Sequence, residues 1–354
     1  MRRTLGSAAA APPRRSPQGA MVRELFAVGH DGTRIYVRKR ERDALPDGDG
    51  ERIRAVLCDG IACDGFIWKY LWDDLARLVD VAHWNYRGHG RSGLPADPDA
   101  IQVTDHARDL AAVREAIGAG PPQAMGSSPS GAPEPVVLVG HSFGCQVVLE
   151  HLRHHREGVR GLILICGAPG RVTHSFKGTD VLAQILPRVI ERVEARPDLA
   201  RALWSNLPPP LALRFALLTG EVDRRSVTPD DVMPYMRHMV DIDVLMFLRM
   251  LRSAGDSDAS DLLPQLDIPA LVIGGDRDSF TPSRRAEEMA AALPRGELLM
   301  AQGGTHVVPL ERKEMVRERV ERFLRERVLA PTSTDEKRIS SSPTSVLEPR
   351  ARGA

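Results

Sequence analysis

The sequence predicts an α/β protein with a mostly parallel sheet, helices on both faces of the sheet, and a helical insertion. Apolar runs of strand length alternate with segments whose apolar residues recur at helical spacing, which is typical of a covered parallel sheet. The alternation stops between about residues 171 and 256 and resumes at Pro269, which indicates the insertion. With 354 residues, 42% of them hydrophobic and 27% charged, the chain is long enough for one large domain with an inserted subdomain.

Two short runs near the start predict a β-hairpin. Residues 24–28 and 34–38 are β-like and flank Asp31-Gly32, which is a favourable hairpin turn. A polar stretch then leads to an apolar strand at 55–58. The expected elements that follow are a helix at 68–78, a strand at 81–86 and an amphipathic helix at 104–117.

The alternation of strands and helices continues on both sides of the insertion. Residues 118–135 are rich in Gly, Pro, Ser and Ala without periodicity, and they predict a flexible loop. The next expected strands are 136–139 and 161–166, with a helix at 145–154 between them. Beyond the insertion we expect strands at 269–274 and 298–300 and helices at 283–293 and 310–328.

These elements predict five segments. The N-terminal segment contains arginine, proline and alanine without an apolar core, and the tail is polar and rich in Ser, Thr and Arg, so both are expected to be disordered. The segments are a disordered start at 1–21, the first part of the core at 22–170, a helical cap at 171–258, the second part of the core at 259–329 and a disordered tail at 330–354.

The composition argues against several classes of partner. The net charge is +1 with basic and acidic residues interspersed, so no nucleic-acid partner is indicated. The longest apolar runs are too short for a membrane span. Four cysteines lie in or beside expected strands without a Cys-x-x-Cys pair, which favours reduced thiols, a cytoplasmic location and no metal site. The oligomeric state is not indicated.

The stretch from Val136 to Gly144 points to a nucleophile. Its apolar run enters the sequence Gly-His-Ser-Phe-Gly and is followed by a helical pattern, so Ser142 lies on a sharp turn between a strand and a helix. Such a turn needs flanking residues without bulk, which Gly140 and Gly144 supply. The N–H of Phe143 at the start of the helix is then a candidate donor to an oxyanion.

Two downstream loops carry the residues that an activated serine requires. One follows the strand at 269–274 and contains Asp276 and Asp278, and the other contains His306 after the last strand. The chain has these residues in the order Ser, Asp, His, and it has a Gly-His-Gly-Arg-Ser turn at 88–92. In both features it resembles members of the α/β-hydrolase superfamily, in the branch with a helical cap. The resemblance covers residues 22–329 and implies a mostly parallel eight-stranded sheet.

This resemblance implies roles for individual residues. Ser142 is expected to be the nucleophile, His306 the general base, and Asp278 the carboxylate that orients the base, in preference to Asp276. Ile61 is expected to be the second oxyanion donor beside Phe143. In the family the loop before that donor usually contains His-Gly, whereas this chain has Asp59-Gly60, which adds a carboxylate near the site.

The expected function is hydrolysis of a small-molecule carboxylic ester with an apolar acyl or alcohol part, without metal, nucleotide or organic cofactor. Two alternatives stay open at this point. The same three residues serve acyl transfer, perhydrolysis or lyase chemistry, and the fold also occurs in binding or scaffold proteins without turnover. Most methionines at 233–250 are expected to pack within the cap, and the alternative is that some face the cleft, where they would suit an acyl chain or other apolar group. His151 and His154 are expected at a solvated helix end.

Overall fold

The computed structural model describes residues 14–15, 21–43, 52–120, 134–211, 214, 222–223 and 225–330. Most of the predicted disordered start at 1–21, of the predicted disordered tail at 330–354 and of the predicted loop at 118–135 lies outside these residues. Within the predicted disordered start, Arg14–Arg15 form a short strand, β1, which pairs with the beginning of β2.

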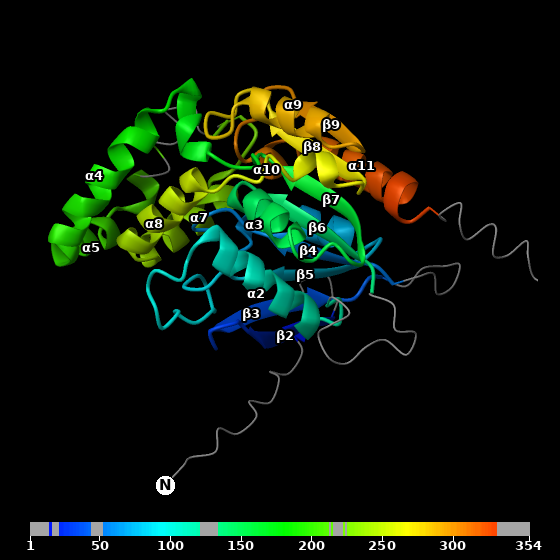
Figure 1. The fold of residues 1–354 in the computed structure, drawn as a ribbon, viewed down its shortest axis with the longest axis horizontal. Coiled ribbons are helices and arrows are strands. Elements are labelled where there is room, and N and C mark those ends of the chain that lie inside the picture. Colours follow the sequence, from blue (N-terminus) through cyan, green and yellow to red (C-terminus); the bar gives the residue numbers. More distant parts are fainter. Residues whose placement is uncertain are drawn as a thin grey trace, which may run out of the picture.

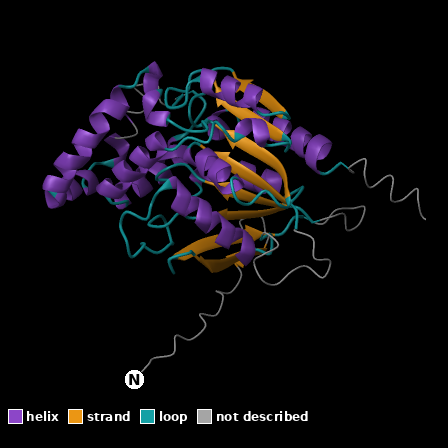
Figure 2. Cartoon of the chain, viewed as in Figure 1, coloured by secondary structure: helices purple, strands orange, loops and turns teal. Residues whose placement is uncertain are grey.

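A nine-stranded sheet runs through the centre of the molecule (Figures 1 and 2). Its order is β1-β2-β3-β5-β4-β6-β7-β8-β9. The strands after β1 are β2 Met21–Val28, β3 Arg34–Arg40, β4 Arg54–Cys58, β5 Asp80–Trp84, β6 Val136–His141, β7 Val159–Ile165, β8 Ala270–Gly275 and β9 Gly296–Ala301. β2 and β3 form the predicted antiparallel hairpin, and all pairs from β5 to β9 are parallel. The predicted eight strands are therefore present, with β1 added at one edge.

Helices cover both faces of this sheet, as the sequence predicted. The helices of the core are α1 Leu71–Leu75, α2 Val103–Ala116, α3 Phe143–Leu152, α9 Ser283–Ala292, α10 Val308–Glu311 and α11 Lys313–Phe323. α2, α3 and α9 contribute to one buried apolar cluster and α1 and α11 to another. Leu138 of β6 lies in the first cluster and its neighbours Val137 and Val139 in the second, because successive side chains of a strand point to opposite faces.

Double coverage explains why the central strands are apolar without interruption. Every residue of β6 and of β8 is buried, so neither face of these strands offers a place for a charged side chain. The edge strand β9 is only partly buried. This accounts for its weak apolar pattern and for the prediction of a shorter strand at 298–300.

Among the residues that the structure describes between β7 and β8, four α-helices stand to the left of the sheet in Figure 1. They are α4 Val181–Ala195, α5 Pro197–Ser205, α7 Pro229–Asp241 and α8 Val244–Asp256. The helix expected at 68–78 is shorter and is preceded by a 3-10 turn, Phe66–Trp68. The helix expected at 310–328 is divided into α10, α11 and a π-helical end, Leu324–Val328. The segment boundaries given above stay predictions.

Among the residues that the structure describes, no helix has both the length and the apolar character needed to cross a membrane.

Candidate active site

Ser142 lies at the junction of β6 and α3 in a backbone conformation that residues other than glycine rarely adopt, with φ 55° and ψ −118°. This confirms the strained turn that the sequence predicts. A Cβ atom at Gly140 would lie 2.7 Å from the backbone of Gly144, and one at Gly144 would lie 2.1 Å from the carbonyl oxygen of Cys58. Only glycine fits at either position, because backbone atoms fill the space that a methyl group would need.

Ser142, His306 and Asp278 form one continuous chain of hydrogen bonds. The hydroxyl of Ser142 donates to Nε2 of His306 at 2.8 Å. Nδ1–H of His306 donates to the carboxylate of Asp278, with distances of 2.9 Å to Oδ2 and 3.1 Å to Oδ1. The three residues follow β6, β9 and β8, so the carboxyl ends of three parallel strands bring them together, with β7 between β6 and β8. Asp276, the other candidate for the orienting carboxylate, is exposed.

The carboxylate of Asp278 is held ionised by its surroundings. It accepts hydrogen bonds from the backbone N–H groups of Phe280 and Thr281, both at 2.9 Å, and from the hydroxyl of Thr281 at 2.7 Å. Burial alone raises the pKa of Asp278, but the neighbouring His306 and the hydrogen bonds outweigh burial and lower it. Asp278 therefore supplies a fixed negative charge behind the imidazole of His306.

The loop that carries His306 is fixed on both sides. Nε2–H of His141, the residue before Ser142, donates to the carbonyl oxygen of His306 at 2.9 Å. Glu311 accepts from the N–H of Thr305 at 2.7 Å and from its hydroxyl at 2.8 Å. Sequence patterns alone did not identify His141 or Glu311, because their partners become visible only when the chain is folded.

The two predicted oxyanion donors lie on adjacent backbone segments. Phe143 is the first residue of α3, where N–H groups have no acceptor within the helix. Ile61 follows Gly60 on the loop after β4, and a Cβ atom at Gly60 would lie 3.3 Å from Cβ of Ser142. Phe143 thus directly follows Ser142, and Ile61 directly follows a glycine that lies against the side chain of Ser142.

Asp59 is fully buried and has two side-chain partners. Nε1–H of Trp68 donates to Oδ1 at 2.6 Å, and Nε2 of His83 lies 2.8 Å from Oδ2. The hydroxyl of Tyr86 also donates to the carbonyl oxygen of Asp59 at 2.7 Å. The carboxylate that replaces the usual histidine is therefore not free to face Ser142. His83 is a buried polar residue between the apolar residues Ala82 and Trp84, which is a signal in the sequence for a buried partner.

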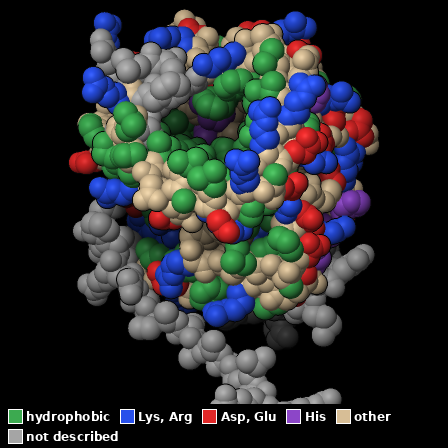
Figure 3. Space-filling view, turned by 90° about the vertical axis from the view of Figure 1, so that its left-hand side faces the viewer, with side chains coloured by type: hydrophobic (Ala, Val, Ile, Leu, Met, Phe, Trp, Pro, Cys, Tyr) green, Lys and Arg blue, Asp and Glu red, His purple; other side chains and the backbone are tan. Residues whose placement is uncertain are grey.

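An aromatic pair lies beside the ring of His306, in addition to its polar partners Asp278 and Ser142. Figure 3 shows a hollow lined by hydrophobic side chains with histidine at its depth, on the side that the insertion helices occupy in Figure 1. The ring of Phe280 lies 4.9 Å from that of His306, and the ring of Phe176 lies 5.1 Å from Phe280. Met236 is buried in a small apolar cluster of the insertion, as expected. Met246 and Met250 are instead buried in the large apolar cluster that α2, α3 and the sheet form, so they pack against the core.

Other reactive groups have structural surroundings. All four cysteines are free and buried, and burial raises the pKa of each thiol. The expectation of a solvated helix end is wrong for His151, which is buried, donates from Nδ1 to the carbonyl oxygen of Ala107 at 3.0 Å and accepts from Arg114 at 2.8 Å. Within the described part of the chain, no group of three metal-binding side chains is present.

Comparisons with known proteins agree with this fold. The chain is 26% identical over 316 residues to polyketide synthase ThaQ of Burkholderia thailandensis, a match that covers 89% of this chain but only 13% of that protein. It is 23% identical over 257 residues to the pimeloyl-(acyl-carrier protein) methyl ester esterase of Vibrio atlanticus, covering 71% of this chain and 86% of that protein. A thermophilic esterase from Thermogutta terrifontis has the same fold, with a TM-score of 0.62 at 21% identity over 86% of this chain and 99% of its own.

The model of the alpha/beta hydrolase family matches residues 56–319. That range contains the strand ends that carry Ser142, Asp278 and His306. The chain belongs to the alpha/beta hydrolase family.

Proposed function

We propose that the protein is a serine hydrolase that cleaves a carboxylic ester with an apolar acyl or alcohol part. The observation that carries the proposal is the hydrogen-bonded chain from Asp278 through His306 to Ser142, with distances of 2.9 Å and 2.8 Å. This arrangement activates a hydroxyl, because the base lies within reach of its proton and a carboxylate orients the base.

In the proposed reaction, Oγ of Ser142 attacks the ester carbonyl while Nε2 of His306 takes the hydroxyl proton. The imidazolium that forms is stabilised by the charge of Asp278, which stays ionised. His306 then gives the proton to the departing alkoxide oxygen, and an acyl group remains on Ser142. A water molecule then attacks this acyl group while Nε2 of His306 takes its proton. His306 gives this proton to Oγ of Ser142 as the bond to the acyl group breaks, and the carboxylic acid is released.

Negative charge develops on the carbonyl oxygen during both steps. The N–H groups of Phe143 and Ile61 are the proposed donors to this oxygen, since both belong to backbone segments packed beside Ser142. Donors fixed in advance stabilise the charge without reorganising, and losing one such donor typically costs about 10²- to 10³-fold in kcat.

The apolar hollow and the nearby phenylalanines favour an apolar substrate. The Vibrio relative is a methyl ester esterase and the Thermogutta protein is an esterase, which supports ester chemistry. We therefore favour ester hydrolysis over the other reactions that the same residues support. A cytoplasmic location stays a prediction.

The proposal is tested with nitrophenyl esters from acetate to decanoate, comparing the native protein with Ser142→Ala. We expect turnover by the native protein that rises with chain length and is lost in the variant. A parallel series with added alcohol distinguishes acyl transfer, which would give a new ester in place of the free acid. A folded native protein that turns over none of these esters would contradict the proposal and favour a binding protein.

A further inference from the structure

The loop that carries Ile61 contains a strained residue. Residues 60–63 form a turn in which the N–H of Cys63 donates to the carbonyl oxygen of Gly60 at 3.4 Å. The third residue, Ala62, has φ 60°, and a turn of this kind normally has glycine there. Holding an ordinary residue at positive φ is unfavourable, because its Cβ atom lies too close to the following carbonyl oxygen. The turn therefore needs contacts that oppose its relaxation.

His89 provides such a contact. The N–H of Ala62 donates to Nε2 of His89 at 3.2 Å, and Nδ1–H of His89 donates to the carbonyl oxygen of Arg87 at 3.1 Å. Both hydrogen bonds fit one neutral form of the ring, with the proton on Nδ1. His89 is buried, and burial lowers its pKa to about 4, so this neutral form is present at neutral pH.

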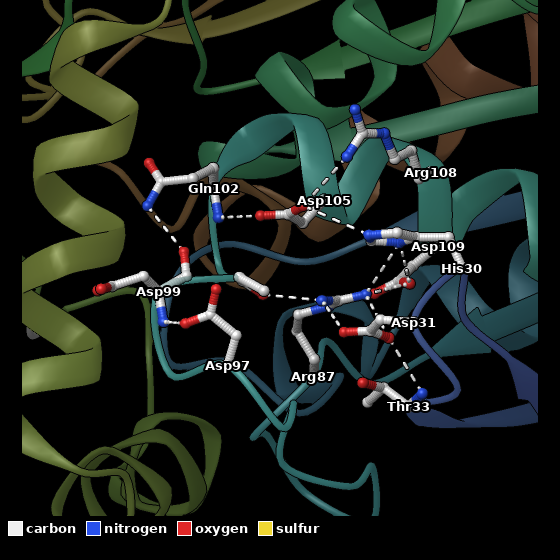
Figure 4. A network of polar contacts seen from close by, with 11 residues as sticks. His30, Asp31, Thr33, Arg87, Asp97, Asp99, Gln102, Asp105, Arg108 and Asp109 are labelled. Carbon is white, nitrogen blue, oxygen red and sulfur yellow. Dashed lines mark hydrogen bonds and ion pairs between the residues drawn. The ribbon is translucent and has the colours of Figure 1, made fainter.

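The turn that presents His89 is itself anchored in the core. The guanidinium of Arg87 donates to Asp109 at 2.7 Å and 2.6 Å, to Asp31 at 2.9 Å and to the carbonyl oxygen of Ala100 at 2.8 Å (Figure 4). Arg87 and Asp109 are both fully buried, so this network holds its geometry. His89 therefore projects from a fixed support.

We infer that His89 is a positioning residue for the oxyanion site, because it accepts the N–H of Ala62 and thereby holds the Gly60–Cys63 turn with Ile61 beside Ser142. This inference rests on the proposed function. Rotation of the peptide between Ile61 and Ala62 would return Ala62 to negative φ and relieve its strain. The same rotation would leave the N–H of Ala62 and Nε2 of His89 buried without partners, which opposes it.

Two substitutions separate the bond to Ala62 from the other contacts of His89. In His89→Asn the shorter amide still donates to the carbonyl of Arg87 but does not reach Ala62. In His89→Gln the amide oxygen occupies the place of Nε2 and accepts from Ala62. Both variants lose the ring and its contact with Tyr86, where the centroids are 6.0 Å apart. Their difference therefore reports the bond to Ala62.

The measurement is kcat and KM of each variant with the best nitrophenyl ester, with thermal unfolding to establish that both are folded. We expect His89→Asn to lose about 30- to 100-fold in kcat with KM changed less than about 3-fold, and His89→Gln to recover at least about 10-fold of that loss.

Equal kcat in the two folded variants, with an active native protein, would overturn the inference alone, whether both are active or both impaired. If the native protein shows no ester turnover that Ser142→Ala removes, the proposed function is overturned, and this inference with it.

Discussion

His141 donates from Nε2–H to the carbonyl oxygen of His306 at 2.9 Å, so the residue before the proposed nucleophile holds the backbone of the proposed base. His141 is buried, and burial together with the nearby His306 lowers its pKa to about 4. It is therefore neutral at neutral pH and adds no positive charge beside the imidazolium that forms on His306. The ends of β6 and β9 are thus joined by a bond that is independent of the hydroxyl of Ser142.

Asp278→Asn should lower kcat by about 10³- to 10⁴-fold, because an amide that donates to Nδ1 favours the wrong tautomer of His306. Steady-state kinetics with the best nitrophenyl ester measures the loss. The matched control is Asp276→Asn, two residues away on the same loop and exposed, which should leave kcat unchanged. A large loss in Asp276→Asn, with little change in Asp278→Asn, would assign the orienting role to the other carboxylate.

Gly144→Ala should destabilise the protein and remove ester turnover. The added methyl group would lie 2.1 Å from the carbonyl oxygen of Cys58 and 2.8 Å from that of Asp59, so α3 must move away from the loop of Ile61. We expect a loss of about 3 kcal/mol in the free energy of unfolding, measured in urea. Gly93→Ala is the control, since its nearest contacts are at 3.5 Å. Equal stability of the two variants would show that the turn at Ser142 tolerates a methyl group at residue 144.

Asp59→Ala should lower the free energy of unfolding by about 2–5 kcal/mol, because it leaves the indole N–H of Trp68 and the ring of His83 buried without their partner. Urea unfolding measures this loss. Asp198→Ala is the control, since the side chain of Asp198 is 97% exposed and its ion pair with Arg201 contributes little. If the two variants unfold at the same urea concentration, Asp59 does not hold the loop after β4.

Stability should fall as the pH drops below 6.5, and His106 should account for part of this loss. Its ring is buried against Tyr86 and Phe143, and burial lowers its pKa well below 6.5. Below pH 6.5 the unfolded chain therefore binds a proton at this residue that the folded chain does not. The cost is about 1.4 kcal/mol per pH unit, or about 2 kcal/mol at pH 5.

His106→Leu removes this proton uptake, so its melting temperature should fall less between pH 7.5 and pH 5 than that of the native protein. Thermal unfolding at both pH values gives the comparison. An identical fall in the two proteins would show that His106 is protonated in the folded state.

The buried strands were the part of the fold that the sequence predicted best. β6 and β8 are covered on both faces, so their uninterrupted apolar runs stand out from the surrounding sequence. The helix at 68–78 was predicted too long at both ends, since α1 covers only Leu71–Leu75. A 3-10 turn precedes it: Gly65, with φ 95°, starts that turn, and the bond from Trp68 to Asp59 ties its end to the loop after β4.

The candidate site was predicted from short local patterns. Ser142, Asp278 and His306 each lie in a loop with a recognisable motif, and the structure places them within hydrogen-bonding distance. The supporting residues were not found in this way. His141 and His89 each act on backbone groups far away in the chain, 165 and 27 residues distant, so no spacing rule reports them.

The central claim is that Ser142 is an activated nucleophile, and labelling with a fluorophosphonate probe tests it most directly. The native protein and Ser142→Ala are treated with the probe under identical conditions, with thermal unfolding as the check that both are folded. We expect rapid labelling of the native protein at Ser142 and none in the variant. Absence of labelling in the folded native protein, or equal labelling of the two proteins, would contradict it.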